Sequence, residues 1–339
     1  TGAYSIMEQI QEVADDVTAR TGVPRHIIAE SDLNDPRLIT ERDGGGYGLA
    51  GQWVDDIHHA LHTIVSGERH AYYEDFGSLD ALAKTLRGGF YFDGTYSSYR
   101  GRTHGRPIDV RSIPAHRLVT YTTTHDQTGN RARGDRPSMN LTPAQQALKA
   151  AVIACSPFTP MLFQGEEWGA STPFAFFCSH TDPELQRLTR EGRMREFARS
   201  GWNPDDVADP VAVETFEDSK LKWAELADEP HATMLSTYRS LFGLRTTRPA
   251  LRNPWATGVE VEVDGGKGRW LRMTRRDDVV FGGGGNDEVT LVANFSDKTV
   301  EVPVDGVRHK DLLHTHDEAP AAVGKNSVEL PAWGYAVLG

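Results

Sequence analysis

Two carboxylates and a histidine stand where short apolar segments of the chain end. Glu30 ends the apolar segment 25–29, and His125 and Asp126 end the β-branched run 118–123. Such runs are typical of buried strands, and a glycine-bearing loop is expected directly after Asp126. Two carboxyl groups at strand ends are suited to acid–base chemistry on a polar bond. Each also has a simpler interpretation, Glu30 as a solvated glutamate and the His125-Asp126 pair as a structural loop element.

The elements that must position these residues alternate between strands and helices. We expect strands at 25–30, 49–53, 117–124 and 160–163, with helices at 5–20, from Asp55 or Asp56, at 144–155 and at 232–246. This alternation indicates an α/β architecture with a parallel sheet. A complete (β/α)8 barrel has eight strands over about 250 residues. Residues 1–250 are therefore predicted to form the second half of such a barrel, with long loops at 31–48, 88–116 and 170–230.

The pattern changes near residue 251. Residues 251–339 contain short alternating segments at 258–263, 268–274, 288–295, 299–304 and 333–338. Several short strands in so few residues predict a small antiparallel β-sandwich as a second domain.

Five segments together are similar to one known family. Residues 29–34 and 125–132 resemble the fifth-strand and seventh-strand motifs of the alpha-amylase family, and residues 52–62, 163–169 and 176–185 extend the likeness. The resemblance implies a retaining alpha-glycosidase that hydrolyses the α-1,4 bond next to the trehalose unit of malto-oligosyltrehalose. It implies no cofactor and no metal. Thr124 and Val54 depart from the family, which usually has Asn and a polar residue at these positions.

The resemblance also implies roles for the strand-end residues. Glu30 would be the general acid/base, Asp126 the carboxylate that stabilises the transition state, and His125 a ligand of the same glucosyl unit. The family's nucleophilic aspartate has no counterpart here, because the carboxylates of the first helix are expected to face away from the site. We therefore expect the nucleophile to lie upstream of Thr1 and the 339 residues alone to be inactive.

A block after the second strand is expected to face the rim of the site and, by resemblance, to recognise trehalose. It contains Trp53, Asp55, Asp56, His58 and His59. An indole stacks on a sugar ring and carboxylates accept hydroxyl protons. Other interpretations are helix caps for the aspartates and packed side chains for the histidines. His58 also shares a helix face with His62, a spacing found in zinc sites, although no third ligand is evident.

An aromatic loop follows between the second and third strands. Its residues Tyr96 and Arg100 are candidates for sugar contacts, with loop packing as the alternative.

Composition narrows the possible partners. The net charge of −12, with basic residues scattered, argues against nucleic acid, and no apolar run has the length of about 20 residues that a membrane span needs. The two cysteines, Cys155 and Cys178, favour reduced thiols and a cytoplasmic location. The expected partner is malto-oligosyltrehalose or a related α-glucan. Two other functions stay open: a glucan branching enzyme or related transglycosylase, and a non-catalytic glycan-binding protein.

Overall fold

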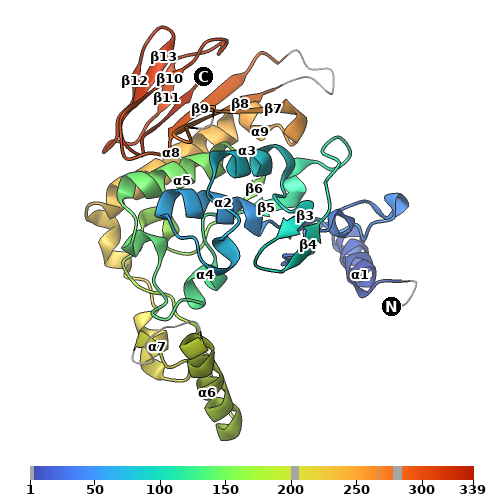
Figure 1. Ribbon diagram of the computed structural model, residues 1–339. Coiled ribbons are helices and arrows are strands. Elements are labelled where there is room, and N and C mark those ends of the chain that lie inside the picture. Colours follow the sequence, from blue (N-terminus) through green and yellow to red (C-terminus); the bar gives the residue numbers. More distant parts are fainter. Residues whose placement is uncertain (1–3, 200–205, 266, 278–284) are drawn as a thin grey trace. The chain divides into compact units, whose positions relative to one another are not determined.

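The computed structural model describes residues 4–199, 206–265, 267–277 and 285–339 (Figure 1). Its contacts divide the chain into two compact units. The first comprises Thr1–Thr122, Leu148–Met161 and Ser240–Gly339, and the second comprises Thr123–Ala147 and Leu162–Arg239.

A parallel sheet lies in the first unit. Its four strands have the order β1-β2-β5-β6 and are short: β1 Ile28–Ala29, β2 Gly51–Trp53, β5 Leu118–Thr120 and β6 Thr159–Pro160. All three neighbouring pairs are parallel, so the carboxyl ends of the strands lie at one edge of the sheet. The predicted α/β class and the four predicted strands are confirmed, although each strand is shorter than expected.

Helices precede, connect and follow the strands of the parallel sheet. Their bounds are α1 Ile6–Thr21, α2 Asp55–Ser66, α3 Leu79–Gly88, α4 His125–Gly129, α5 Pro143–Cys155, α6 Pro183–Arg199, α7 Val213–Asp218, α8 His231–Thr247 and α9 Pro249–Arg252. The helices expected at 5–20, 144–155 and 232–246 are thus confirmed as α1, α5 and α8. Thr142 precedes Pro143, and its Oγ1 accepts a hydrogen bond from the backbone N–H of Gln145 at 3.3 Å, as expected for an N-cap.

Helix α1 begins with a capping box. The side chain of Ser5 accepts a hydrogen bond from the backbone of the first turn, and the Glu8 carboxylate accepts one from the backbone N–H of Ser5 at 2.8 Å. The apolar side chains spaced along this helix are largely exposed: Ile6 at 62%, Ile10 at 42% and Val13 at 63%.

Two of the three predicted long loops contain regular structure. Segment 88–116 holds an antiparallel hairpin of β3 Asp93–Ser97 and β4 Arg102–Gly105. Segment 170–230 holds the helices α6 and α7, which belong to the second unit (Figure 1). The prediction of loops without regular structure was wrong here, because the apolar residues of α6 are few and spread around the helix, so no apolar stripe marks it in the sequence.

Two antiparallel sheets occupy the C-terminal part of the first unit (Figure 1). One has the order β11-β14-β9-β8-β7 and the other β10-β13-β12. The bounds are β7 Val259–Val263, β8 Trp270–Arg276, β9 Glu288–Asn294, β10 Val300–Pro303, β11 Leu312–His314, β12 Ala322–Val323, β13 Ser327–Leu330 and β14 Tyr335–Leu338. All five predicted strands are present, and β11 to β13 were missed.

The buried apolar side chains of both C-terminal sheets form one cluster. It includes Val292 of β9 and Leu338 of β14 from the larger sheet, and Val302 of β10 and Val328 of β13 from the smaller sheet. Because these residues alternate with exposed ones along β10 and β13, the alternation seen in the sequence reflects one buried face.

The two cysteines are free, as expected, with Cys155 buried at the end of α5. Burial raises the pKa of the Cys155 thiol to about 12. Over the described ranges, no helix has both the length and the apolar character that crossing a membrane requires.

Candidate active site

Glu30 follows β1 directly and is exposed, at the edge where the parallel strands end. The loop after it is fixed by the hairpin. Arg100 pairs with Asp32 at 2.6 Å, and His104 of β4 donates a hydrogen bond to the carbonyl oxygen of Asp32 at 2.7 Å. Two contacts to Asp32, two residues beyond Glu30, therefore hold the backbone that carries the candidate acid/base.

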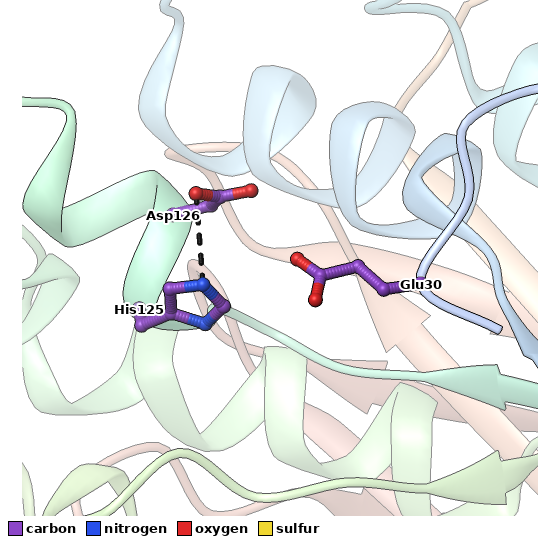
Figure 2. A group of neighbouring side chains, drawn as sticks. All are labelled: Glu30, His125 and Asp126. Atoms are coloured by element: carbon purple, nitrogen blue, oxygen red, sulfur yellow. Dashed lines mark ion pairs between the residues drawn. The ribbon is translucent and has the colours of Figure 1, made fainter. Parts of the chain in front are cut away.

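His125 and Asp126 begin the short helix α4 rather than lying in a loop, which corrects the prediction (Figure 2). The two side chains are 51% and 56% exposed, and His125 Nε2 lies 3.7 Å from Asp126 Oδ1. Asp126 stands in the first turn, where the helix dipole stabilises a negative charge. Glu30 belongs to the first unit and this pair to the second.

A capping box explains why α4 begins at His125. Thr124 Oγ1 accepts a hydrogen bond from the backbone N–H of Asp126 at 3.2 Å, and Gln127 Oε1 accepts one from the backbone N–H of Thr124 at 2.7 Å. Asn, which the family usually has at this position, is also a favoured N-cap, so Thr124 keeps the same local structure.

The Thr124→Ala variant is expected to lose about 1 kcal/mol of the free energy of unfolding, the usual value of an N-cap side chain. Thr124→Ser should stay close to the parent protein, since serine keeps the accepting hydroxyl oxygen. Urea unfolding of both variants measures the difference. Equal losses in the two variants would show that the methyl group, and not the cap, contributes the stability.

The rim residues separate into an accessible and a buried group. Trp53 and Asp55 are partly buried at the end of β2 and the start of α2. The Trp53 ring lies 5.6 Å from that of Tyr121, edge to face, and the Tyr121 hydroxyl donates a hydrogen bond to Asp55 Oδ1. Tyr121, a positioning residue, was not singled out from the sequence; its place as the one hydroxyl-bearing aromatic in a β-branched run was the available signal.

Asp56 is buried and serves the fold. Its Oδ2 accepts hydrogen bonds from the backbone N–H groups of Tyr91 and Phe92 at 2.7 and 3.0 Å, and from Asn34 Nδ2 at 2.7 Å. Burial raises the pKa of this carboxyl to about 6, although the three donors favour the charged form. Val54 is the N-cap of α2 and no side chain caps it, so neither predicted role of Asp56, at the rim or as a helix cap, holds.

The histidines of α2 are packed rather than presented to a ligand. His58 Nδ1 and Nε2 lie 2.6 Å from the Thr122 carbonyl oxygen and 3.1 Å from the Tyr73 hydroxyl, and the ring of His59 packs against Tyr72, Tyr73 and Phe76. His62 Nε2 lies 2.9 Å from Glu68 Oε2. The prediction that His58 and His59 face the rim is wrong, and the interpretation as packed histidines replaces it.

These histidines predict an acid-sensitive fold. Burial lowers the pKa of His59 to about 3 and that of His58 well below its usual value, so both stay neutral when folded while the unfolded chain binds protons below about pH 6.5. Their contribution to stability is complete above about pH 6.5 and falls as the pH drops towards 3. Asp56 opposes this between about pH 6 and 3.8, because there the folded state binds the proton.

Urea unfolding at about pH 7 and about pH 5 is the test, with His59→Gln expected to reduce the slope by up to about 1.4 kcal/mol per pH unit. The exposed His70, replaced by glutamine, is the matched control. A parent protein whose stability is equal at both pH values would contradict the prediction.

Tyr96 and Arg100 lie on the β3–β4 hairpin. Tyr96 is 63% exposed, and Arg100 keeps its ion pair with Asp32. Two ion pairs lie in the segment that follows Asp126: Arg131 pairs with Asp135 at 2.7 Å, and Arg133 pairs with Asp206.

No family model matches the chain, but curated sequences and solved structures do resemble it. It is 47% identical over 338 residues to a malto-oligosyltrehalose trehalohydrolase of Mycobacterium tuberculosis, covering 100% of this chain and 55% of the relative. It is 49% identical over 336 residues to the enzyme of that name from Rhizobium sp. strain M-11, covering 99% and 54%. The chain thus spans about half the length of the curated relatives it matches.

Solved structures agree with the sequences. A protein of Salmonella typhimurium assigned to the alpha amylases matches with a TM-score of 0.80 at 30% identity, over 99% of this chain and 55% of that one. The alpha-amylase of H. orenii matches with a TM-score of 0.54 at 14% identity, over 98% and 56%, which supports the fold alone. These similarities are to proteins of the alpha-amylase type. Over essentially its whole length, the chain is similar to about half of the malto-oligosyltrehalose trehalohydrolases of two bacteria.

Proposed function

We propose that the protein hydrolyses the α-1,4 bond next to the trehalose unit of malto-oligosyltrehalose, with retention, and releases trehalose. The observation that carries this proposal is the 47–49% identity to enzymes of that name over essentially all of this chain. The exposed carboxylate of Glu30 at the end of β1 and that of Asp126 in the first turn of α4 supply groups suited to the chemistry.

In the proposed mechanism Glu30 protonates the glycosidic oxygen of the leaving group. It then removes a proton from the water that hydrolyses the glycosyl intermediate. Asp126 and His125 bind hydroxyl groups of the glucosyl unit as positive charge develops on its anomeric carbon. Support comes from β1 and β5, which end at the same edge of one parallel sheet, so that the segments following them start close together. The nucleophile that a retaining mechanism needs is not assigned to a residue of this chain.

Trehalose recognition is proposed for the accessible rim residues. Trp53 offers an indole face, and Asp55, oriented by the Tyr121 hydroxyl, accepts sugar hydroxyl protons. Tyr96, exposed on the hairpin, and Arg100 are proposed to contact the same product. The buried Asp56, His58 and His59 have no part in this proposal.

The architecture extends the proposal. We infer that residues 1–250 form the second half of a (β/α)8 barrel and residues 251–339 a β-sandwich domain, supported by the four parallel strands and by the apolar cluster shared by the two antiparallel sheets. A cytoplasmic location is proposed on the two free thiols.

Trehalose release from malto-oligosyltrehalose tests the function, using the protein made from its complete reading frame beside the 339 residues alone. Release by the complete protein is expected, with none from the shorter chain. Transfer of glucan chains without free trehalose would instead favour a branching enzyme. Glucan binding without turnover by either form would favour a glycan-binding protein.

A further inference from the structure

An exposed tryptophan of the second unit packs against Trp168, a residue that lines a pocket of mixed polar and apolar side chains. Trp223 begins a 3-10 helix at Trp223–Ala227 and is 66% exposed, while its neighbour Trp168 is 2% exposed. The two ring centroids are 5.4 Å apart with the planes tilted by 41°. An indole held at the surface by a neighbouring ring offers a flat apolar face that a ligand can stack on.

Glu225 fixes the tryptophan pair. Its Oε1 accepts hydrogen bonds from Trp168 Nε1 at 2.8 Å and from the backbone N–H of Ser171 at 3.1 Å, and its Oε2 accepts one from the Ser171 hydroxyl at 2.6 Å. These contacts tie the 3-10 helix that presents Trp223 to segment 168–171. The indole is therefore presented from a braced backbone, which reduces the ordering cost of binding.

The adjoining pocket has a volume of about 320 Å³ and shares Trp168 as part of its wall. Its polar lining includes Ser138, Gln146, Ser171 and His231. This volume is at the small end of the range for ligand sites, which suits one ring of a larger molecule.

Each of these four polar side chains already donates one hydrogen bond inside the protein. Ser138 Oγ donates to the Ala170 carbonyl at 2.7 Å, Gln146 Nε2 to the Leu141 carbonyl at 2.9 Å, and His231 Nδ1 to the Trp168 carbonyl at 2.8 Å. The Ser171 hydroxyl donates to Glu225. Two hydroxyl oxygens, the Gln146 amide oxygen and the His231 Nε2 remain as acceptors, and the Gln146 amide keeps a second N–H as a donor.

We propose that Trp223 and this pocket form a second glucan-binding site, separate from Glu30 and Asp126. A pyranose ring has an apolar face for the indole and for the apolar part of the lining, and hydroxyl groups for its polar side chains. One sugar ring occupies the pocket and the chain continues across Trp223. The choice of an α-glucan rests on the proposed function, whereas the placement of the site rests on the geometry alone.

The experiment is a calorimetric titration of the complete protein with maltoheptaose. The protein carries Glu30→Gln, which slows turnover during the measurement. Two binding events are expected, and Trp223→Ala should weaken one of them by about tenfold, the factor that corresponds to about 1.4 kcal/mol. Trp223→Tyr should retain most of that affinity. Phe216→Ala, an exposed aromatic of the same unit, is the matched control and should change neither event.

Several results would overturn the proposal. The first is a single binding event in the titration with maltoheptaose. The second is two events that Trp223→Ala leaves unchanged, in a variant whose circular dichroism matches that of the parent protein. The third is saturation of the site by a tetraalkylammonium ion and not by maltoheptaose. Trehalose release is measured separately. Release together with glucan binding that ignores Trp223 would reject this site and keep the function, while Trp223-dependent binding without release would reject the function and keep the site.

Discussion

Replacing Glu30 by glutamine lowers the rate of trehalose release by the complete protein by about a thousandfold, within the range that general acid–base catalysis contributes. Glutamine occupies nearly the same volume but supplies no titrating proton. The departing sugar oxygen must then leave as an alkoxide, which is a poor leaving group. Steady-state kinetics on malto-oligosyltrehalose measure this loss.

The leaving group separates an acid/base role from a structural one. With an aryl α-glucoside, whose phenolate leaves without protonation, Glu30→Gln should lose much less of the rate of the first chemical step. Glu74→Gln, at an exposed glutamate of the same unit, is the control and should match the parent protein. An equal loss on both substrates would remove Glu30 from the acid/base role.

The Asp56→Ala variant is expected to lose about 3 kcal/mol or more of the free energy of unfolding. Alanine leaves three buried donors, the N–H groups of Tyr91 and Phe92 and the amide of Asn34, without the acceptor they share, and each unsatisfied group costs about 1–3 kcal/mol. Asp56→Asn should lose less, because the amide oxygen still accepts. Urea unfolding with Asp80→Ala, an exposed aspartate in the first turn of α3, gives the matched comparison.

A loss in Asp56→Ala no larger than in Asp80→Ala would contradict this account. It would mean that water replaces the carboxylate, and that the hydrogen bonds of Asp56 contribute little beyond those of an exposed side chain.

The sequence predicted the elements whose apolar pattern and local caps agree. The predicted limits of helices α5 and α8, whose middle turns contain apolar residues, are close to the observed ones. The same holds for strands β7 to β10. Helix α6 was missed because its charged surface leaves no apolar stripe, although the ion pairs Arg187 with Glu184 and Glu191 stabilise it locally. Hairpin β3–β4 was missed because its strand residues are mostly exposed.

The candidate site shows a different limit. The position of Glu30 directly after a strand was predicted from the sequence, since a strand followed by a polar residue is a local signal, whereas Asp126 lies in α4, beyond the end of β5. Burial is not local. Asp56, His58 and His59 share the first turns of α2 with Asp55, and only the packing of residues 91–92 and 72–76 over that helix distinguishes the buried residues from the accessible one.

The single carboxylate of Asp56 has a consequence for anyone who exchanges segments between relatives of this protein. Three segments are joined by hydrogen bonds to Asp56 Oδ2, at the start of α2. The donors are Asn34, in the loop after β1, and the backbone N–H groups of residues 91–92, in the turn after α3. A graft that moves one of these segments alone would bring a backbone adapted to a different acceptor position. The three segments therefore form one structural unit, and a chimaera should exchange all three of them or none.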